Sequence, residues 1–452
     1  GLLALGAGAS LLKGFDYEEA TLLLVLLGAL LPCHRFFYRR TALMAEPFTP
    51  GWTLAIMGVV AAALWLTLFA YRHVEYSNEL WWRFAFHASA PRSLRAAVGV
   101  LASLAIVGTA RLLRPAPLDP GPPDDVDLER AAAVIARAGA SEANLALLGD
   151  KRFLYNEAGT AFIMYGVEGR SWVALHDPVG PDSQLDELAW RFRELVDRHA
   201  GWTVFYEVSR RRLPLYLDLG LTLLKLGEEA RVPLEEFTLE GAHRKTLRRF
   251  HRGVEKTGVS FDVLPAGATD APFAELRAVS DGWLTLKRTR EKSFSLGNFD
   301  EHYLGRFPMG IARQGGRIVA FTNIWPSGDR EELSADLMRY LPDAPPNVMT
   351  WLFVELMLWG RREGYRWFNL GMAPLSGLPN RKLASRWLRL GGFVYRHGEH
   401  FYNFKGLRQY KERFDPVWEP RYLASPGGLL VPRVLANVAT LVGGGLTGVV
   451  GK

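Results

Sequence analysis

The chain opens with long apolar runs and then changes to a shorter alternation of apolar and polar positions. Residues 51–71 carry no charged side chain, and residues 20–33 and 96–110 form two further uncharged runs. A helix needs about 20 apolar residues to cross the hydrocarbon core of a bilayer. The pattern therefore predicts an α-helical transmembrane segment over residues 1–114.

A proline-rich linker follows this segment, and arginines just before the linker indicate that the chain leaves the membrane on the cytoplasmic side. Beyond the linker, apolar residues alternate over short strands and recur every three or four positions in helices. The predicted parts are the linker (115–125), a first half (126–240), a basic connecting helix (241–258), a second half (259–424) and an apolar tail (425–452). We expect the tail to pack on the membrane or on the two halves.

The two halves show the same order of elements. The first has predicted strands at 153–155, 161–167, 171–175 and 203–207, with an amphipathic helix at 185–196. The second has predicted strands at 309–313, 317–325, 332–338 and 366–370. Gly315-Gly316 is a hairpin turn, and Asn347 is expected to cap a helix that runs to Gly364, where glycine suits the position after the helix end.

Local sequence matches also relate the halves. Residues 199–206 parallel 362–369, residues 211–213 parallel 381–383, and Gly227-Glu228 parallels Gly398-Glu399. We interpret this as an internal duplication. The order hairpin, strand, helix, strand is typical of a GNAT-type acyltransferase, so the predicted fold is α+β with tandem GNAT-like acyltransferase domains.

Composition and absent motifs exclude several kinds of chemistry. The chain has 54 Lys and Arg against 47 Asp and Glu, a modest excess that suits a polyanion or an anionic lipid surface. Its single cysteine excludes a disulfide framework or a cysteine zinc site within the chain. Prolines and acids at 177–182 and 340–346 replace the glycine-rich loop that would hold acyl-CoA pyrophosphate. No Walker loop, HExxH or GxSxG motif is present, and we expect neither a cofactor nor a metal.

Candidate catalytic residues lie in the second half. Asp336 and Arg339 stand near the end of a predicted strand, where a spacing of three puts them on opposite faces unless the strand has ended. They are either active-site groups or a structural ion pair. Glu399 is a third candidate, although its counterpart Glu228 suggests a role in the fold. Carboxylates of this kind suit an α-ammonium group, and nearby cations suit phosphate.

Further polar residues follow in the same half. We expect Lys405 and Arg408 to share one helix face, unless that face is simply solvated. Asn369 and Ser376 either line the site or shape a turn. The full set of substrate-binding candidates is Lys405, Arg408, Lys411, Asn369, Ser376 and Asn403.

The connecting helix is strongly basic. Its sequence HRKTLRRFHR, residues 243–252, suits either tRNA phosphates or anionic lipid headgroups. A solvated linker helix is the alternative. The candidate phosphate-binding residues are Arg244, Lys245, Arg248, Arg249 and Arg252. A second basic run, residues 287–292, is expected to be a loop.

The chain resembles the aminoacyl-phosphatidylglycerol synthases, also called multiple peptide resistance factors. The resemblance rests on four motifs: YRHVEYSN (71–78), LSADLMR (333–339), WFNLGMAPLSG (367–377) and RHGEHFYNFKGLR (396–408). It implies tandem GNAT-like domains with a tunnel open to tRNA on one side and to lipid on the other. Asp336 and Arg339 match the acidic–basic pair of the family's active site, and Glu399, Lys405 and Arg408 are carried over with them.

The resemblance also implies the reaction and its setting. A lysyl or alanyl group would pass from aminoacyl-tRNA to the headgroup hydroxyl of phosphatidylglycerol, giving a cationic lipid that confers resistance to cationic antimicrobial peptides. The implied partners are aminoacyl-tRNA, phosphatidylglycerol and its membrane, a flippase region of the same or a longer chain, and a second copy in a homodimer. The implied location is the bacterial cytoplasmic membrane, with the catalytic domains in the cytoplasm.

Two other functions remain open from the residues. One is an aminoacyltransferase that builds peptidoglycan cross-bridges, which would share the tandem domains but has no need of membrane helices. The other is a lipid flippase or transport subunit with a regulatory soluble part. Within the synthase reading, either Asp336 or Glu399 could hold the α-ammonium group or act as the base.

Overall fold

A computed structural model describes residues 17–30, 121–268, 271–378 and 404–443. Helix α2 (Tyr17–Leu30) belongs to a different compact unit from the remainder and is described by itself. Across the described residues, no helix combines the length and the apolar character needed to cross a bilayer. The predicted membrane runs at 51–71 and 96–110 lie outside the described residues, and α2 covers only part of the run at 20–33.

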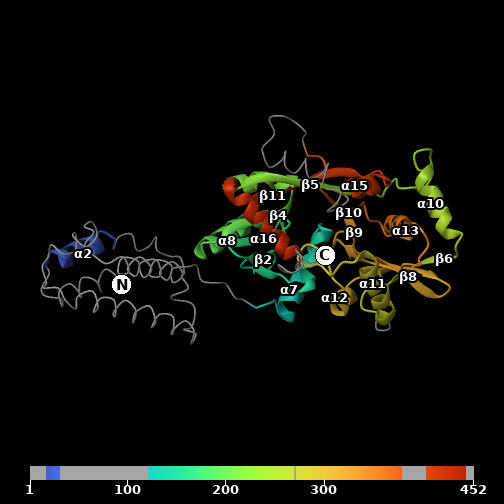
Figure 1. Cartoon of the computed structure of the whole chain (residues 1–452), viewed down its shortest axis with the longest axis horizontal. Coiled ribbons are helices and arrows are strands. Elements are labelled where there is room, and N and C mark those ends of the chain that lie inside the picture. The colour runs from blue at the N-terminus through green and yellow to red at the C-terminus, as the bar shows by residue number, and fades with distance from the viewer. Residues whose placement is uncertain (1–16, 31–120, 269–270, 379–403, 444–452) are drawn as a thin grey trace, which may run out of the picture. The chain divides into compact units, whose positions relative to one another are not determined.

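The remainder is built on one sheet of 11 strands, in the order β1-β2-β3-β4-β11-β5-β10-β9-β8-β7-β6 (Figure 1). The elements of the first half are α7 (Asp125–Ile135), η2 (Ser141–Leu148), β1 (Arg152–Tyr155), β2 (Phe162–Glu168), β3 (Ser171–Leu175), α8 (Asp182–Arg198), β4 (Trp202–Ser209), η3 (Arg210–Arg212), α9 (Leu213–Asp218) and β5 (Thr222–Pro233).

The second half contributes the following elements: α10 (Lys245–Glu255), β6 (Val259–Leu264), α11 (Phe273–Lys287), α12 (Glu301–Gly305), β7 (Met309–Gln314), β8 (Arg317–Pro326), β9 (Glu332–Tyr340), α13 (Val348–Arg362), β10 (Trp367–Pro374), α15 (Phe404–Glu412), β11 (Val417–Ser425), η5 (Gly428–Leu430) and α16 (Val431–Gly443).

Each half repeats one arrangement of strands. Antiparallel strands lead into a parallel pair joined by a crossover helix, β3-α8-β4 in the first half and β9-α13-β10 in the second. The last strand of each half is exchanged: β5 pairs with β10, and β11 pairs with β4. Because β5 and β11 also pair with each other, the middle of the sheet contains strands of both halves.

Local sequence explains several of these elements. The predicted apolar face of α8 is buried through Leu188, Phe192 and Val196, which confirms the amphipathic pattern. Gly315 and Gly316 both have positive φ in the β7–β8 turn, as the predicted hairpin requires. Gly364 also has positive φ just after α13. Asn347 is the N-cap residue of α13, as predicted, but its backbone is left-handed and its side chain makes no capping hydrogen bond.

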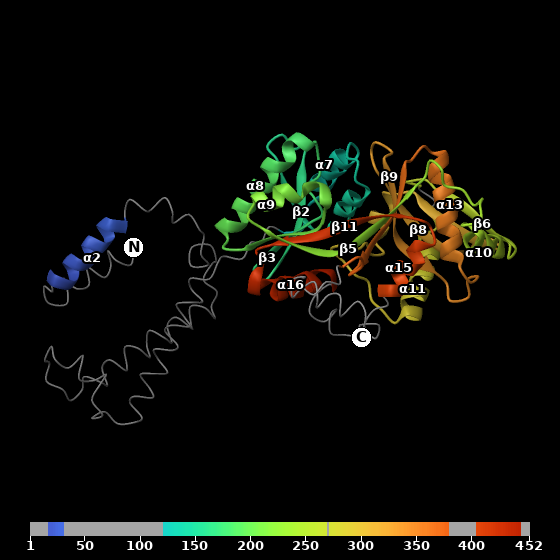
Figure 2. The ribbon, with the colours of Figure 1, turned by 90° about the horizontal axis from the view of Figure 1, so that it is seen from above.

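Helices cover both faces of the sheet. Figure 2 shows α8 and α16 on opposite sides of β3 and β11. One apolar core includes Val434 and Val438 of α16 together with Val173 of β3, and a second includes Trp351 of α13. The described part of the apolar tail therefore packs on the sheet, which was one of its two expected places.

Candidate functional site

Asp336 lies on β9 with its carboxylate surrounded by donors. Oδ1 accepts a bond from the Gly297 N–H at 3.0 Å. Oδ2 accepts bonds from the Tyr303 hydroxyl at 3.0 Å and from Asn323 Nδ2 at 3.3 Å. Burial raises the pKa of Asp336, while these bonds and the charge of Arg339 oppose the rise. The Asp336 carboxylate is therefore fixed in position. It also binds a proton more readily than the carboxylate of a solvent-exposed aspartate does.

A β-bulge turns Asp336 and Arg339 toward the same face of the sheet. Ala335 opposes Ile324 and Met338 opposes Thr322, so Asp336 and Leu337 together stand opposite one residue of β8. The extra residue cancels the odd spacing. Tyr303 of α12 contacts Asp336, and Trp283 of α11 lies 4.1 Å from the Arg339 guanidinium. The expectation of opposite faces is therefore wrong, because β9 continues to Tyr340 through a bulge.

Arg339 does not form the direct ion pair that was the alternative for these residues. Its Nη2 bonds Glu291 Oε2 at 2.8 Å, on the loop that follows α11. Its Nε is buried and has no hydrogen-bond partner among the described residues. Burial lowers the pKa of Arg339, and the charges of Glu291 and Asp336 oppose this effect.

Two residues next to this cluster were missed from the sequence. Lys151 is fully buried, and its ammonium group bonds Asp150. Asp150 Oδ2 also accepts the Phe294 N–H at 2.8 Å, on the loop whose Gly297 reaches Asp336. Burial lowers the pKa of Lys151, opposed by Asp150 and Asp336. A lysine just before a short strand carries no pattern that would indicate burial.

A second cluster lies where the exchanged strands meet. The sequence Glu-x-Arg occurs in β5 as Glu229 and Arg231, and in β11 as Glu419 and Arg421. The two copies pair reciprocally. Arg421 bonds Glu229 at 2.5 Å and Arg231 bonds Glu419 at 3.1 Å. The two-residue spacing puts each pair on one face of its strand, which is the signal that could have revealed this cluster.

Further carboxylates join the paired arginines. Arg421 also bonds Glu142 of η2 at 3.0 Å, and Arg231 bonds Glu332 of β9 at 2.7 Å. Burial alone raises the pKa of Glu142, but Arg421 and His176 lower it to about 2. Burial and repulsion from Glu142 and Glu229 raise the pKa of Glu332 to about 7, against the attraction of Arg231.

Four of the predicted substrate-binding residues lie around this second cluster. Asn369 Nδ2 bonds Glu332 Oε1 at 3.2 Å. Ser376 accepts the Glu228 N–H at 3.1 Å, and the Glu228 carboxylate pairs with Arg408. The structure therefore gathers these residues at β5 and β10, whereas Asp336 and Arg339 belong to a different cluster farther along β9.

Lys411 is the fourth of these residues and is buried beneath a bulge in β10. Its Nζ donates to the carbonyl oxygens of Gly371 at 2.9 Å and Met372 at 2.8 Å. Burial lowers the pKa of Lys411 to about 7, and attraction from Glu229 and Glu207 opposes this. Lys411 thus stabilises the irregular stretch of β10 between Asn369 and Met372.

We expect Lys411→Met to lower the free energy of unfolding by about 1–3 kcal/mol at pH 7, because two buried carbonyls lose their donor. The folded-state pKa lies below the unfolded value, so the wild type gains stability as pH rises from 7 toward 10.5. The deficit should therefore grow by about 2 kcal/mol between pH 7 and pH 9. Urea unfolding at both pH values measures it. Lys256→Met, at an exposed lysine after α10, is the control, and an equal deficit in both variants would contradict the role.

A cavity of about 470 Å³ opens beside the second cluster. It lies between the α7–η2 connection, the segment after β3, and the turn before β9. Its walls include Glu142, Glu229, Arg231, Glu332 and Arg421. The walls of this polar cavity therefore come from both halves of the chain, including the exchanged strands β5 and β11.

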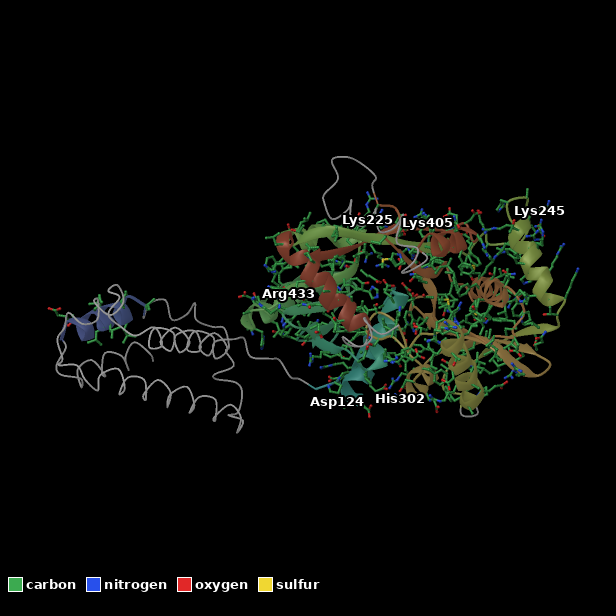
Figure 3. All side chains as sticks on the ribbon, viewed as in Figure 1. Asp124, Lys225, Lys245, His302, Lys405 and Arg433 are labelled. Atoms are coloured by element: carbon green, nitrogen blue, oxygen red, sulfur yellow. The ribbon has the colours of Figure 1, made fainter. Side chains whose placement is uncertain are left out.

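The cationic side chains of the basic helix α10 are of two kinds, those that pack within the fold and those that are exposed. Arg244 is buried against Phe237 and faces Asp415 at 3.8 Å, and Arg248 bonds the carbonyl oxygens of Leu239 and Gly241. Lys245, Arg249 and Arg252 are exposed. Within the sheet-containing unit, Figure 3 shows Lys245 and Arg433 of α16 well apart, with Lys245 at the outer edge beyond α13. Only these three of the five candidates have side chains free to meet a phosphate backbone.

Glu399 and Asn403 lie outside the described residues, as do the motifs at 71–78 and 396–403. Lys405 lies on α15 beside this gap and is partly buried. Among the described residues, His251, Glu255 and Glu355 carry possible metal-ligand atoms within 4.8 Å of one another. In the structure, His251 links α10 to α13 by bonding Glu355 at 2.6 Å.

The strand order and crossover helices define a GNAT-like fold with one enlarged sheet. Residues 132–425 match the family described as phosphatidylglycerol lysyltransferase, C-terminal. The chain belongs to this family. The match covers both halves of the sheet and the clusters around Asp336 and Arg421.

Named relatives agree with this assignment. The chain is 37% identical over 304 residues to a phosphatidylglycerol lysyltransferase of Bacillus subtilis, covering 67% of this chain and 35% of that protein. It is 36% identical over 276 residues to one of Staphylococcus aureus, covering 61% of this chain and 33% of that protein. The chain thus spans about a third of the length of these relatives.

Two solved structures are similar over the sheet. The C-terminal domain of a protein named as a lysylphosphatidylglycerol synthetase from Agrobacterium fabrum is 41% identical, with a TM-score of 0.65, over 71% of this chain and 98% of that one. The structure of L-PGS from Bacillus licheniformis is 37% identical, with a TM-score of 0.65, over 72% of this chain and 99% of that one. The expected family is confirmed.

Proposed function

We propose that the protein transfers an aminoacyl group, lysyl in the first place and alanyl as the alternative, from aminoacyl-tRNA to the headgroup hydroxyl of phosphatidylglycerol. The family match over residues 132–425 carries this proposal. It includes Asp336, Arg339 and the described substrate-binding candidates. The product would be a cationic lipid, which lowers the affinity of a membrane for cationic antimicrobial peptides.

The reaction exchanges one ester for another and needs no cofactor. The lipid hydroxyl oxygen attacks the acyl carbon, the ribose oxygen leaves, and the proton of the hydroxyl ends on that ribose oxygen. A carboxylate beside the hydroxyl can carry this proton between the two oxygens. Asp336 suits the task because its raised pKa makes it readily protonated, and three donors fix its position. Glu399 remains the alternative base.

The acceptor and its setting are part of the same proposal. Phosphatidylglycerol places the reaction at a membrane, which we take to be the bacterial cytoplasmic membrane with this sheet on the cytoplasmic side. The partners would include a flippase region of the same or a longer chain, and a second copy of the chain. The apolar runs before residue 115 favour a membrane acceptor over a peptidoglycan precursor.

A product assay separates the proposed function from its rivals. The chain is incubated with lysyl-tRNA or alanyl-tRNA and with vesicles of phosphatidylglycerol, and the lipids are separated by chromatography. A new, more cationic lipid is expected with at least one donor. A peptidoglycan precursor in place of the vesicles tests the cross-bridge enzyme, and lipid movement without a new product would indicate the transporter.

The exposed cations of α10 are proposed to bind tRNA phosphates. We expect a triple variant, Lys245→Glu, Arg249→Glu and Arg252→Glu, to weaken tRNA binding at least tenfold and to reduce its salt dependence. Filter binding at several salt concentrations measures both effects. The matched control reverses the same charge at Arg288, Arg290 and Lys292, which are also exposed. Equal losses in the two variants would indicate general charge attraction and not a site on α10.

A further inference from the structure

Residues 291–297, which we call the strap, connect the two members of the candidate catalytic pair. The strap follows α11, and its described residues form neither helix nor strand. At its start, Glu291 bonds Arg339 at 2.8 Å. At its end, the Gly297 N–H donates to Asp336 at 3.0 Å. The strap is therefore part of the surroundings of both Asp336 and Arg339.

The Gly297 backbone lies directly against the Asp336 carboxylate. A Cβ atom at this position would overlap both oxygens of Asp336. Only a residue without a Cβ atom therefore allows this approach. The hydrogen bond between them is 3.0 Å long, so a displacement of the strap by about 1 Å would break it. The position of the strap thus decides whether Asp336 keeps all three of its donors.

Phe294 holds the middle of the strap in an unusual backbone conformation. Its φ is 63°, in the left-handed region that bulky residues rarely adopt. Its ring is buried in the core that also contains Val438 of α16, and its N–H donates to Asp150 Oδ2 at 2.8 Å. Such a conformation persists only where the surrounding contacts impose it. The core and the Asp150 carboxylate therefore fix the strap together.

Asp150 joins the strap to a buried lysine. One oxygen of its carboxylate accepts the Phe294 N–H, and the other bonds the Lys151 ammonium group. Lys151 is 1% exposed, and burial of an ammonium group is costly unless a carboxylate pairs with it. The charge of Asp336 also attracts this ammonium group. Lys151 is therefore placed to act on both the strap and Asp336.

We propose that Asp150 and Lys151 are positioning residues of the transfer reaction, which hold the strap so that the Gly297 N–H stays bonded to Asp336. The inference rests on the proposed function, with Asp336 as the base. The Gly297 N–H and the Lys151 ammonium group both favour the ionised carboxylate, which is the form that accepts the proton of the lipid hydroxyl. A cavity of about 350 Å³ beside the strap gives it room to move when this hold is lost.

The charges around Asp336 predict the direction of the effect. They belong to titratable groups from four parts of the chain: Tyr303 of α12, Arg339 of β9, Glu291 of the strap, and Asp150 and Lys151 before β1. Burial lowers the pKa of Lys151, and attraction to Asp336 opposes this. The attraction is mutual, so it also lowers the pKa of Asp336. Lys151→Met removes this attraction and leaves the Asp150 carboxylate unpaired, and both changes raise the pKa of Asp336.

Hydrogen exchange followed by mass spectrometry tests the hold on the strap without donor or lipid. In Asp150→Ala and in Lys151→Met, a peptide covering residues 291–298 should exchange at least tenfold faster than in the wild type. Peptides from β4 should keep their exchange rate, which shows that the sheet remains folded. Asp218→Ala, at an exposed carboxylate on α9, is the control and should leave the exchange of the strap unchanged.

Single-turnover rates over a pH series, with lysyl-tRNA and vesicles of phosphatidylglycerol, connect the strap to the chemistry. For Lys151→Met, the midpoint of the acid limb should rise by about one pH unit or more, the order expected for the loss of one nearby charge. A purely structural defect would lower the rate at every pH alike and leave the midpoint unchanged.

Gly297→Ala displaces the strap directly and keeps the test decisive if the Asp150 or Lys151 variants unfold. The added methyl group would overlap the Asp336 carboxylate, so the strap must move and the hydrogen bond must break. The acid limb of this variant should also shift to higher pH. Gly121→Ala, where a Cβ atom meets nothing within 4 Å, is the matched control and should follow the wild-type pH profile.

The outcomes separate this inference from the proposed function. Unchanged strap exchange in folded Asp150→Ala and Lys151→Met would overturn the positioning role even if lipid product forms. An unshifted acid limb in the folded Lys151 and Gly297 variants would overturn it as well. A wild-type chain that makes no lipid product would contradict the proposed reaction, and faster exchange in the variants would then still support the hold of Asp150 and Lys151 on the strap.

Discussion

Asp336→Asn is expected to lower the rate of lipid aminoacylation by roughly 10²–10⁴-fold, the range for losing a general acid–base group. Asparagine nearly preserves the volume of the side chain but cannot take a proton from the lipid hydroxyl. Burial raises the pKa of Asp336, so the ionised base forms only as pH rises through that value. The wild-type rate should therefore increase with pH on the acid side, and the variant should lose this limb.

Single-turnover rates over a pH series, with saturating lysyl-tRNA and vesicles of phosphatidylglycerol, measure both effects. Asp343→Asn is the matched control, because Asp343 is an exposed carboxylate paired with Arg317 on the surface. Circular dichroism and urea unfolding show whether the Asp336 variant keeps its fold. A folded Asp336→Asn protein with the wild-type rate would remove Asp336 from the mechanism and leave Glu399 as the candidate base.

Asp336 also shows how far sequence reasoning could reach. Its residue type and its position on a strand were predicted, as was its association with Arg339. The face of Arg339 was not, because a β-bulge depends on how β9 pairs with β8 and has no signature within LSADLMR. The alternation of residues along a strand predicts which face a side chain lies on only where the strand pairs regularly with its neighbour. The prediction for Arg339 was wrong because β9 pairs irregularly with β8 at this point.

Most of the fold followed from local patterns, but the strand exchange did not. The hairpin at Gly315-Gly316 and the face of α8 depend on nearby residues, which the sequence displays directly. The pairing of β5 with β10 joins residues more than 130 positions apart, such as Val232 and Phe368. Which strands pair over such distances depends on the packing of the whole chain and not on the alternation of apolar and polar residues within one strand.

A short motif also recurs in the exchanged strands of the two halves. Glu-x-Arg occurs in β5 and again in β11, at positions 229 and 419, and the two copies form the charged centre of the sheet. The longer match of residues 199–206 with 362–369 is visible in the sequence, whereas this motif has only two fixed positions. The β5 and β11 copies are 190 residues apart (229 to 419), which is longer than the separation of the other matches. A search at fixed spacing therefore passes over them.

Arg421→Met is expected to lower the free energy of unfolding by about 3–5 kcal/mol, the cost of removing one partner from a buried ion pair. Arg421 is buried and bonds both Glu142 and Glu229, so its loss leaves two carboxylates without their guanidinium. These bonds join η2, β5 and β11, so the substitution should destabilise the central strands of the sheet as well. Arg421→Lys should recover only part of the lost stability, because an ammonium group lacks the planar guanidinium whose several N–H donors can bond both carboxylates.

Urea unfolding measures this effect, with Arg317→Met as a surface control expected to cost at most about 1 kcal/mol. Adding Glu142→Gln and Glu229→Gln to Arg421→Met should restore much of the stability, because no unpaired charge remains. The pKa of Glu142 is about 2 in the fold, below its unfolded value, so its pairing stabilises the protein above about pH 4.5 and is lost as pH falls toward 2. The loss of unfolding free energy caused by Arg421→Met should therefore become smaller as the pH falls over that range. A loss below 1 kcal/mol at pH 7 would show that the paired arginines and glutamates do not hold the exchanged strands together.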